Sequence, residues 1–198
     1  MFNWDNTQNL VNLYQALLLG YLDEIRIYIS IPEFQAPSKI TPYSIDEFVY
    51  LGQIFDKFHS VANQLNNRKK GKRPFVIDDE TDVQDLLHAL MTPVFEDIRI
   101  DEPTPSYAGK FAKMDFTIKE KQIVIETKIA SPSHLEDKIS DELIPDIIRY
   151  KERKDYNILI CFIYDPEFKL KKAPSLKNDL EKMSTPGLAV EVVIEPKR

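Results

Sequence analysis

Two short strands joined by four polar residues constrain this chain more than any other feature. Residues 113–118 (KMDFTI) and 123–128 (IVIETK) each have the composition of a strand, and residues 119–122 between them fit a hairpin loop. If the hairpin is symmetric about its loop, Ile118 faces Ile123. The sequence therefore predicts an antiparallel pair whose register is set by the length of the loop.

The same register brings charged side chains together at the open end of the hairpin. It places Asp115 opposite Glu126, with Cβ atoms ~5 Å apart, and like charges at that spacing are destabilising. A fold accommodates this pair most easily when a cation lies between the two carboxylates. Alternation along the strand puts Glu126 and Lys128 on one face, and Ile125 and Thr127 on the other. The acidic pair and the lysine are thus expected to converge on one point.

Composition places the chain among globular proteins. Its 198 residues are 43% hydrophobic, which is enough for one domain with a sizeable core plus a smaller appendage. The net charge of −6 argues against a protein that coats nucleic acid through bulk charge, although it leaves room for local basic patches.

Cysteine and histidine usage argues against a protein held by disulfides and against a zinc protein. The single cysteine, Cys161, lies in an apolar run and is expected to be a buried thiol. His59, His88 and His134 are scattered without cysteine partners, so we expect no zinc site. The N-terminus has no signal-peptide pattern and no stretch able to span a bilayer, so we expect a cytoplasmic protein that does not associate with membranes.

Three regions follow from the pattern along the chain. Residues 1–67 carry helical periodicity over about 6–30 and again over 44–65, and predict an N-terminal helical region for oligomerisation or partner binding. Residues 68–73 are basic and form an exposed linker, for which a solvated segment and a nucleic-acid grip are both open. Residues 74–198 form the remaining domain.

That last domain has the element order of an α/β fold. We expect helices that cross between the final strands of a mixed sheet, and Pro145 should kink or restart the first of these helices. In chain order, the expected elements are a helix at 81–91, a strand at 95–100, the hairpin, a helix at 135–154, a strand at 156–164, a helix at 176–183 and a strand at 188–194.

The convergent side chains suit metal-assisted phosphodiester hydrolysis. Two carboxylates are a sufficient protein contribution to a Mg²⁺ site, which also takes waters and phosphate oxygens. Lys128 adds a fixed positive charge for the transition state. Glu80 lies on the same helical face as Val83 and Leu87, which predicts a third carboxylate facing the same point. The alternative is that Glu80 only favours a helix N-terminus.

From residue 74 onward the chain resembles the PD-(D/E)XK, or restriction-endonuclease-like, nuclease superfamily. The closest likeness is to the nuclease domain of MboI-type restriction enzymes and of other bacterial phage-defence proteins. The segments that carry the resemblance are residues 77–90 (IDDETDVQDLLHAL), 104–109 (TPSYAG), 114–116 (MDF), 123–128 (IVIETK), 146–150 (DIIRY) and 161–166 (CFIYDP).

The resemblance implies a fold and a set of roles. The fold is a mixed central sheet flanked by helices. Asp115 and Glu126 would hold Mg²⁺, for which Mn²⁺ can substitute, and Lys128 would assist catalysis. Glu80 would complete the site. Met114 stands where the superfamily's nominal proline precedes the aspartate, a frequent departure because that proline has no chemical role.

Four further residues are candidates for nucleic-acid contacts. Arg149 and Tyr150 follow an apolar helical face and would reach a phosphate near the site; the alternative is a solvated helix end. Lys110 and Lys113 lie on the segment that enters the Asp115 strand, where they would contact phosphates; the alternative is an ordinary connecting loop.

These expectations combine into a metal-dependent nuclease, acting on DNA in prokaryotic anti-phage defence. The acidic net charge suggests a homodimer or higher oligomer, or a defence-system partner that supplies grip. The alternative is a catalytically inactive nuclease-like module that binds nucleic acid or scaffolds a defence complex. The residues leave open DNA or RNA, strand preference and recognition sequence.

Overall fold

The computed structural model describes residues 47–103 and 113–197, which belong to one compact unit, Ile45–Arg198. The expected helix over about 6–30 and the candidate Lys110 lie outside the described residues. Among the described helices, none has both the length and the apolar character needed to cross a membrane.

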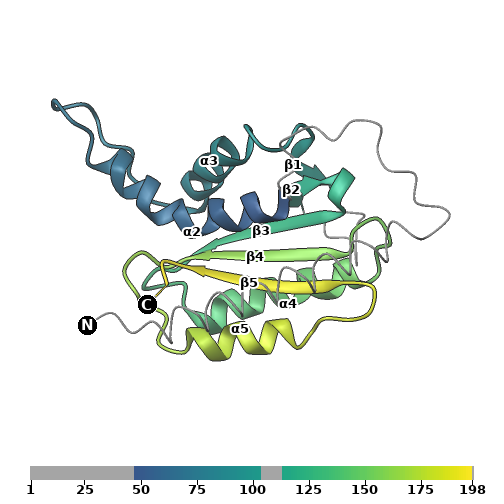
Figure 1. Cartoon of the computed structure of the whole chain (residues 1–198). Helices are drawn as coiled ribbons and strands as arrows, with labels where there is room; N and C mark the ends of the chain where they lie inside the picture. Colours follow the sequence, from purple (N-terminus) through teal and green to yellow (C-terminus); the bar gives the residue numbers. More distant parts are fainter. Residues whose placement is uncertain (1–46, 104–112, 198) are drawn as a thin grey trace, which may run out of the picture. The chain divides into compact units, whose positions relative to one another are not determined.

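A five-stranded mixed sheet lies at the centre, with its strands in chain order (Figure 1). The first three strands are antiparallel neighbours, and the last three are parallel neighbours. Because parallel strands need a crossover, helices connect them, as the sequence predicted. The strands are β1 (Ile98–Pro103), β2 (Lys113–Ile118), β3 (Ile123–Ile129), β4 (Ile158–Tyr164) and β5 (Ala189–Glu195).

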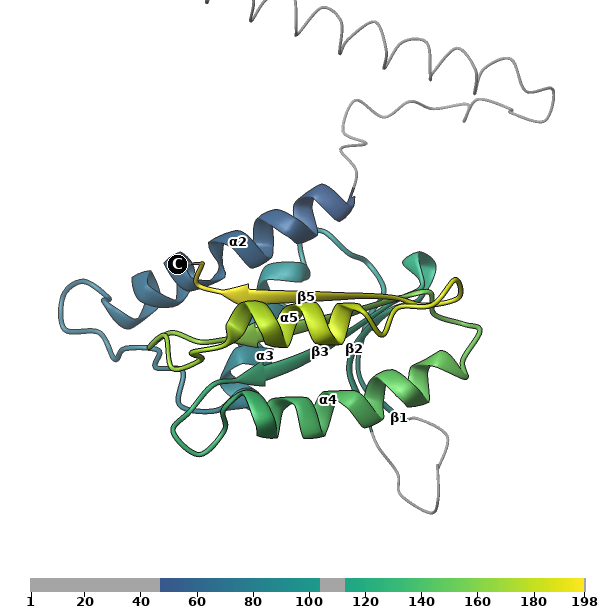
Figure 2. The ribbon, with the colours of Figure 1, turned by 90° about the horizontal axis from the view of Figure 1, so that it is seen from below.

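In the described part of the chain, four α-helices cover the two faces of this sheet, two on each face (Figures 1 and 2). One face is covered by α2 (Glu47–Asn66) and α3 (Glu80–Met91), and the other by α4 (Glu136–Lys151) and α5 (Ala173–Glu181). A single 3₁₀ turn, η1 (Lys119–Lys121), closes the hairpin between β2 and β3. This is the mixed sheet flanked by helices that the sequence predicted.

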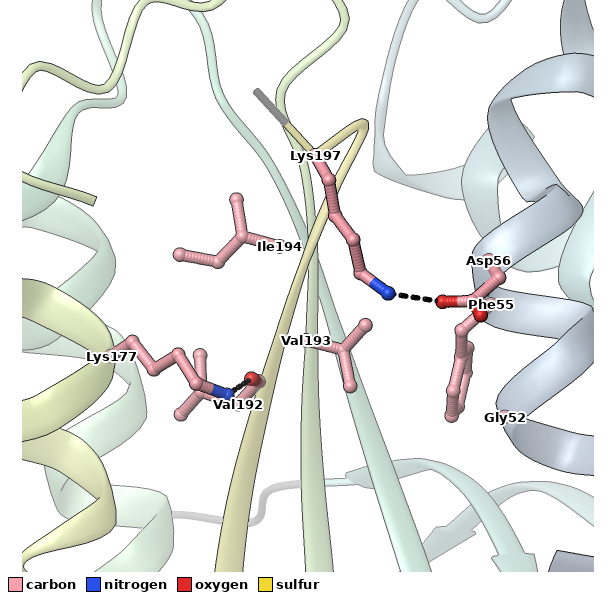
Figure 3. Close-up of a pocket in the computed structure, with 8 residues that line it drawn as sticks. All are labelled: Gly52, Phe55, Asp56, Lys177, Val192, Val193, Ile194 and Lys197. Atoms are coloured by element: carbon pink, nitrogen blue, oxygen red, sulfur yellow. Dashed lines mark hydrogen bonds and ion pairs between the residues drawn. The ribbon is translucent and has the colours of Figure 1, made fainter. Parts of the chain in front are cut away.

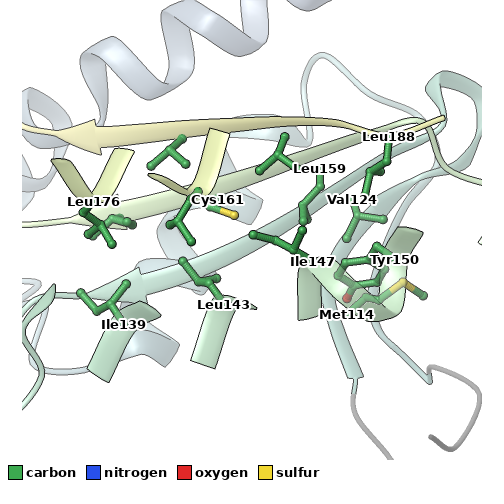
Figure 4. Packing of buried hydrophobic residues seen from close by; sticks show 14 of the residues in the cluster. Met114, Val124, Ile139, Leu143, Ile147, Tyr150, Leu159, Cys161, Leu176 and Leu188 are labelled. Atoms are coloured by element: carbon green, nitrogen blue, oxygen red, sulfur yellow. The ribbon is translucent and has the colours of Figure 1, made fainter. Parts of the chain in front are cut away.

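The core under α4 and α5 is mainly aliphatic (Figure 4). Leu143 and Ile147 of α4 pack against the sheet and are fully buried. Cys161 lies on the same face of β4, and burial raises the pKa of its thiol. The prediction of a buried, free thiol is confirmed.

The core under α2 and α3 is rich in aromatic side chains. Phe55 of α2 stacks on Phe162 of β4, with ring centroids 5.1 Å apart, and Phe58 meets both Phe162 and Tyr164 edge-on at 5.0 Å. The helix 47–66 is therefore part of the core that covers the sheet. The structure thus differs from the expected division, which put this helix in a separate N-terminal region and made 68–73 a linker between regions.

Two local expectations are corrected. The restart expected at Pro145 does not occur: α4 is continuous through this residue, and Leu143 and Ile147 on either side of it are both buried in the core. The first strand begins at Ile98 rather than at Phe95. Phe95 is buried in the turn after α3, where its backbone N–H donates to Met91 O.

The outer edge of β5 is covered by side chains from α5 and the turn that follows it. Val192 O accepts from Lys177 Nζ, Val192 N donates to Glu181 Oε1 at 3.0 Å, and Val190 N donates to Ser184 Oγ at 3.0 Å. Figure 3 shows Lys177 at this edge, beside a cavity of about 400 Å³ whose other side is formed by α2. Such contacts block the pairing of a further strand at these positions.

Candidate active site

The hairpin opens at the point where the candidate carboxylates lie. The predicted pair Ile118–Ile123 is confirmed, and the ladder between β2 and β3 ends at Phe116–Ile125. One residue further, the Asp115 side chain takes the place of a ladder bond. Its Oδ2 accepts from Thr127 N at 2.7 Å and from Thr127 Oγ1 at 2.7 Å.

The neighbouring strand is also distorted beside Asp115. The register of β1 and β2 pairs Ile100 with Phe116 and Glu102 with Met114, which places Asp101 opposite Asp115. Asp101 has a φ of 54°, in the left-handed region, and its carboxylate faces Lys113 Nζ at 3.2 Å. Asp115 therefore lies where regular pairing is interrupted on both sides of β2, and its side chain is half-buried.

Glu126 is the most deeply buried carboxylate of the group. It is 3% exposed, and it accepts a hydrogen bond from the hydroxyl of Tyr150 on α4. Burial raises the pKa of Glu126 well above its usual range, and the nearby charge of Asp115 raises it further, while the Tyr150 bond opposes the rise. The site thus holds two carboxylates close enough to repel each other.

Lys128 lies between the two helical layers. Its Nζ is 3.0 Å from Glu80 Oε1 and 3.2 Å from Glu80 Oε2, and 3.8 Å from Glu142 Oε2 of α4. Burial alone would lower the pKa of Lys128, but Glu80, Asp115 and Glu126 outweigh it and raise the pKa, so Lys128 is charged at neutral pH. Burial likewise raises the pKa of Glu80, against the opposing effect of Lys128.

The start of α3 explains how Glu80 reaches this point. Asp79 is the N-cap, and its Oδ1 accepts from Thr81 N at 2.9 Å and from Asp82 N at 3.2 Å. Asp82 Oδ2 in turn accepts from Asp79 N at 3.2 Å, which completes a capping box. Because neighbouring aspartates cap the helix, the Glu80 carboxylate is left to pair with Lys128.

Two further polar side chains lie around the site, and no role was predicted for either of them. Gln84 of α3 donates to Thr127 Oγ1 at 3.1 Å, and Asp146 of α4 accepts from Arg149. Burial raises the pKa of Asp146, against the effect of Arg149. Gln84 follows Glu80 by one helical turn, and Asp146 precedes Tyr150 by one helical turn. Helical spacing therefore could have placed each of them on the same helix face as a candidate residue.

The four candidates for nucleic-acid contact are distributed differently from the catalytic candidates. Tyr150 is fully buried and its hydroxyl is bound to Glu126, so in this structure it faces the carboxylate rather than the surface. Arg149 is largely buried beside Asp146, and its Nε has no hydrogen-bond partner among the described residues. Lys113 is exposed and paired with Asp101. Lys110 lies outside the described residues.

The donor set fits a metal that needs few protein ligands. Within residues 47–103 and 113–197, no group of three or more histidine, cysteine or acidic side chains is arranged to hold a metal ion. Glu80 is accordingly not gathered with Asp115 and Glu126, because both of its oxygens face Lys128. Asp115 and Glu126 alone match the one or two carboxylates that Mg²⁺ usually takes from a protein.

Comparison with known proteins supports the same reading of the fold. Residues 50–197 match a family model, DpnII-MboI, described as REase_DpnII-MboI. No curated protein and no solved structure matches the chain. The matched residues include nearly all of α2 and every other described helix and strand, with the Asp115, Glu126 and Lys128 cluster among them. Such a match over most of the chain shows that it belongs to the DpnII–MboI family of restriction endonucleases, which supports a DNA-cleaving hydrolase.

Proposed function

We propose that this protein is a Mg²⁺-dependent endodeoxyribonuclease that acts in the cytoplasm, in prokaryotic defence against phage DNA. One observation carries the proposal. Asp115, Glu126 and Lys128 meet where the hairpin between β2 and β3 opens, where Lys128 keeps a buried charge and the two carboxylates repel each other. Burying like charges together is costly, and a bound cation would relieve that cost.

Asp115 and Glu126 are the proposed metal ligands. Thr127 fixes Asp115 through Oδ2, and Tyr150 fixes Glu126 through Oε1, so both carboxylates are held in place before anything binds. Bound Mg²⁺, or Mn²⁺ in its place, would activate water and neutralise charge on the phosphate. The Tyr150 bond is donated to Glu126 and therefore favours the ionised form of that carboxylate.

Lys128 is the proposed stabiliser of negative charge on the phosphate. Its ammonium group is charged and positioned by Glu80, so it needs no reorganisation when the substrate arrives. Glu80 would join the metal only by releasing Lys128. We therefore propose that Glu80 first orients Lys128, and that a role as a third ligand follows only after this ion pair opens.

The acidic net charge of this chain bears on its assembly. The net charge of −6 opposes binding of a polyanion, so we propose a homodimer or higher oligomer, or a defence-system partner, that adds grip on DNA. The covered positions along β5 disfavour an oligomer built by continuing the sheet at that edge.

Cleavage assays with matched variants test the proposal. Purified protein is incubated with supercoiled plasmid, linear duplex and single-stranded DNA, in Mg²⁺, Mn²⁺ or EDTA. We expect cleavage of DNA only with metal, and a loss of 10²-fold or more in Asp115→Asn and in Lys128→Met. Lys151→Met, at an exposed position on the last turn of α4, is the control and should cleave normally.

The same assay distinguishes an active nuclease from the alternative, a catalytically inactive nuclease-like module. That module would bind DNA, yet the wild-type protein would leave every substrate intact under all metal conditions. Full cleavage by both Asp115→Asn and Lys128→Met would instead remove the proposed mechanism.

A further inference from the structure

The loop between α2 and α3 carries the densest run of positive charge in the chain. Five of the six residues from 68 to 73 are basic, in a protein with a net charge of −6. All five are exposed to solvent. They are Arg68, Lys69, Lys70, Lys72 and Arg73.

This loop has a defined turn. Lys70 and Gly71 both adopt left-handed backbone conformations, with φ of 62° and 63°. Arg68 Nη1 donates to Arg73 O at 3.1 Å across the turn, and Phe75 N donates to Leu65 O at 3.2 Å at its base. The charges are therefore displayed on a closed loop with a fixed stem.

The stem lies at the end of the sheet where β3 and β4 finish, which is also the end that carries the site. Asn66 and Phe75 line a small cavity together with Tyr164, the last residue of β4. Tyr164 pairs in register with Ile129, which directly follows Lys128 on β3. Figures 1 and 2 both show the loop extending from the end of the domain toward which the arrows of β3 and β5 point.

The charges on this loop are unbalanced, unlike those inside the site. None of the five basic side chains forms an ion pair with any residue that the structure describes, whereas Lys128 is paired with Glu80 and Arg149 with Asp146. Concentrated like charges repel one another, and a bound polyanion neutralises them. Binding also releases the counterions of the polyanion, which favours the complex. A row of phosphates is the matching partner.

We propose that the loop 68–73 binds the phosphate backbone of duplex DNA beside the cleavage point. This inference rests on the proposed function for its substrate. Lys70 is four residues from Asn66, so the tip extends at most about 14 Å from the stem. At 3.4 Å per base pair, that reach covers roughly four base pairs of one strand. The loop thus adds phosphate contacts near the site, and these contacts do not depend on the DNA sequence.

The experiment measures DNA binding separately from cleavage. A fluorescent duplex is titrated with full-length protein in EDTA at several salt concentrations, for wild type and for two matched pairs. Lys69→Gln with Lys72→Gln alters the loop, and leaves Lys70 and Gly71 to preserve the turn. Lys151→Gln with Lys154→Gln removes the same charge from exposed positions that precede β4, at the opposite end of the parallel strands.

We expect the loop pair to weaken binding by tenfold or more at 0.1 M salt, and to lower the slope of log K against log salt by about 1.8. The control pair should change neither quantity by a comparable amount, and both pairs should melt at the wild-type temperature. An unchanged slope in the loop pair, or an equal loss in both pairs, would overturn the inference even if the wild type cleaves DNA. A selective loss in the loop pair would support it even if no cleavage is seen, so the two proposals fail separately.

Discussion

Glu102 offers a sharp test of the electrostatics of this fold, at a position away from the proposed ligands. Its carboxylate on β1 accepts from Thr117 Oγ1 at 3.0 Å and from Tyr156 Oη at 3.0 Å, and Lys119 Nζ lies 2.6 Å away. Partial burial alone would raise the pKa of Glu102, but these bonds outweigh it and lower the pKa from 4.5 to about 2.

The expected contribution to stability follows from that shift. Its full value corresponds to about 3 kcal/mol of unfolding free energy. The side chain keeps 20% exposure, and solvent screening reduces the contribution to about 1–2 kcal/mol. Because the folded pKa is the lower one, this stability is fully present above pH 4.5 and is lost as the pH falls toward 2. Less than half of it should remain at about pH 3.

Urea unfolding between pH 7 and pH 3 measures this contribution. Glu102→Gln should lower the free energy of unfolding at pH 7 by about 1–2 kcal/mol, and the difference from wild type should shrink steadily below pH 4.5. Glu191→Gln, on the exposed face of β5, is the control and should change little. An equally large loss at pH 3 and pH 7 would show that the carboxylate acts through packing or neutral hydrogen bonds, and would refute the electrostatic reasoning.

Two further predictions concern the aromatic core and the site. Phe58→Ala should cost about 3–5 kcal/mol of unfolding free energy, because Phe58 is fully buried between α2 and the rings of β4; urea unfolding with a surface control, Lys57→Ala, measures it. Tyr150→Phe should move the acidic limb of the cleavage profile to higher pH, since the Tyr150 bond lowers the pKa of Glu126 and its loss leaves that carboxylate harder to ionise. A pH–rate profile identical to wild type would contradict this role for Tyr150.

Much of the fold was predictable because local patterns determine it. The length of the hairpin loop and the alternation of β3 gave the Ile118–Ile123 pair correctly. The apolar stripe of α2 indicated one buried face through Phe55 and Phe58. It could not show what covers that face, because the partner, Phe162, is about a hundred residues away in the chain. The assignment of that helix to a separate region failed for this reason.

The candidate site was predictable only in its strand residues. Asp115, Glu126 and Lys128 share short segments whose spacing brings them together. The groups that orient them come from helices on both faces, Tyr150 from α4 and Glu80 from α3, and their contacts depend on how those helices pack. Tyr150 follows an apolar stripe and precedes Lys151, a pattern that also fits a solvated helix end. The sequence therefore identified it as a candidate and misplaced its partner.

Burial of Glu126 beside Asp115 lowers the stability of the free protein, and this loss needs an explanation. A buried carboxylate beside another carboxylate has a raised pKa, and at neutral pH that is a loss of folding stability. Replacing Glu126 by a neutral side chain would relieve it, so stability alone does not account for the charge. Lys128 offsets only part of the loss, because both oxygens of Glu80 already occupy its Nζ. A carboxylate that destabilises the free protein fits the proposed metal site, because a divalent cation bound there with DNA would offset the loss.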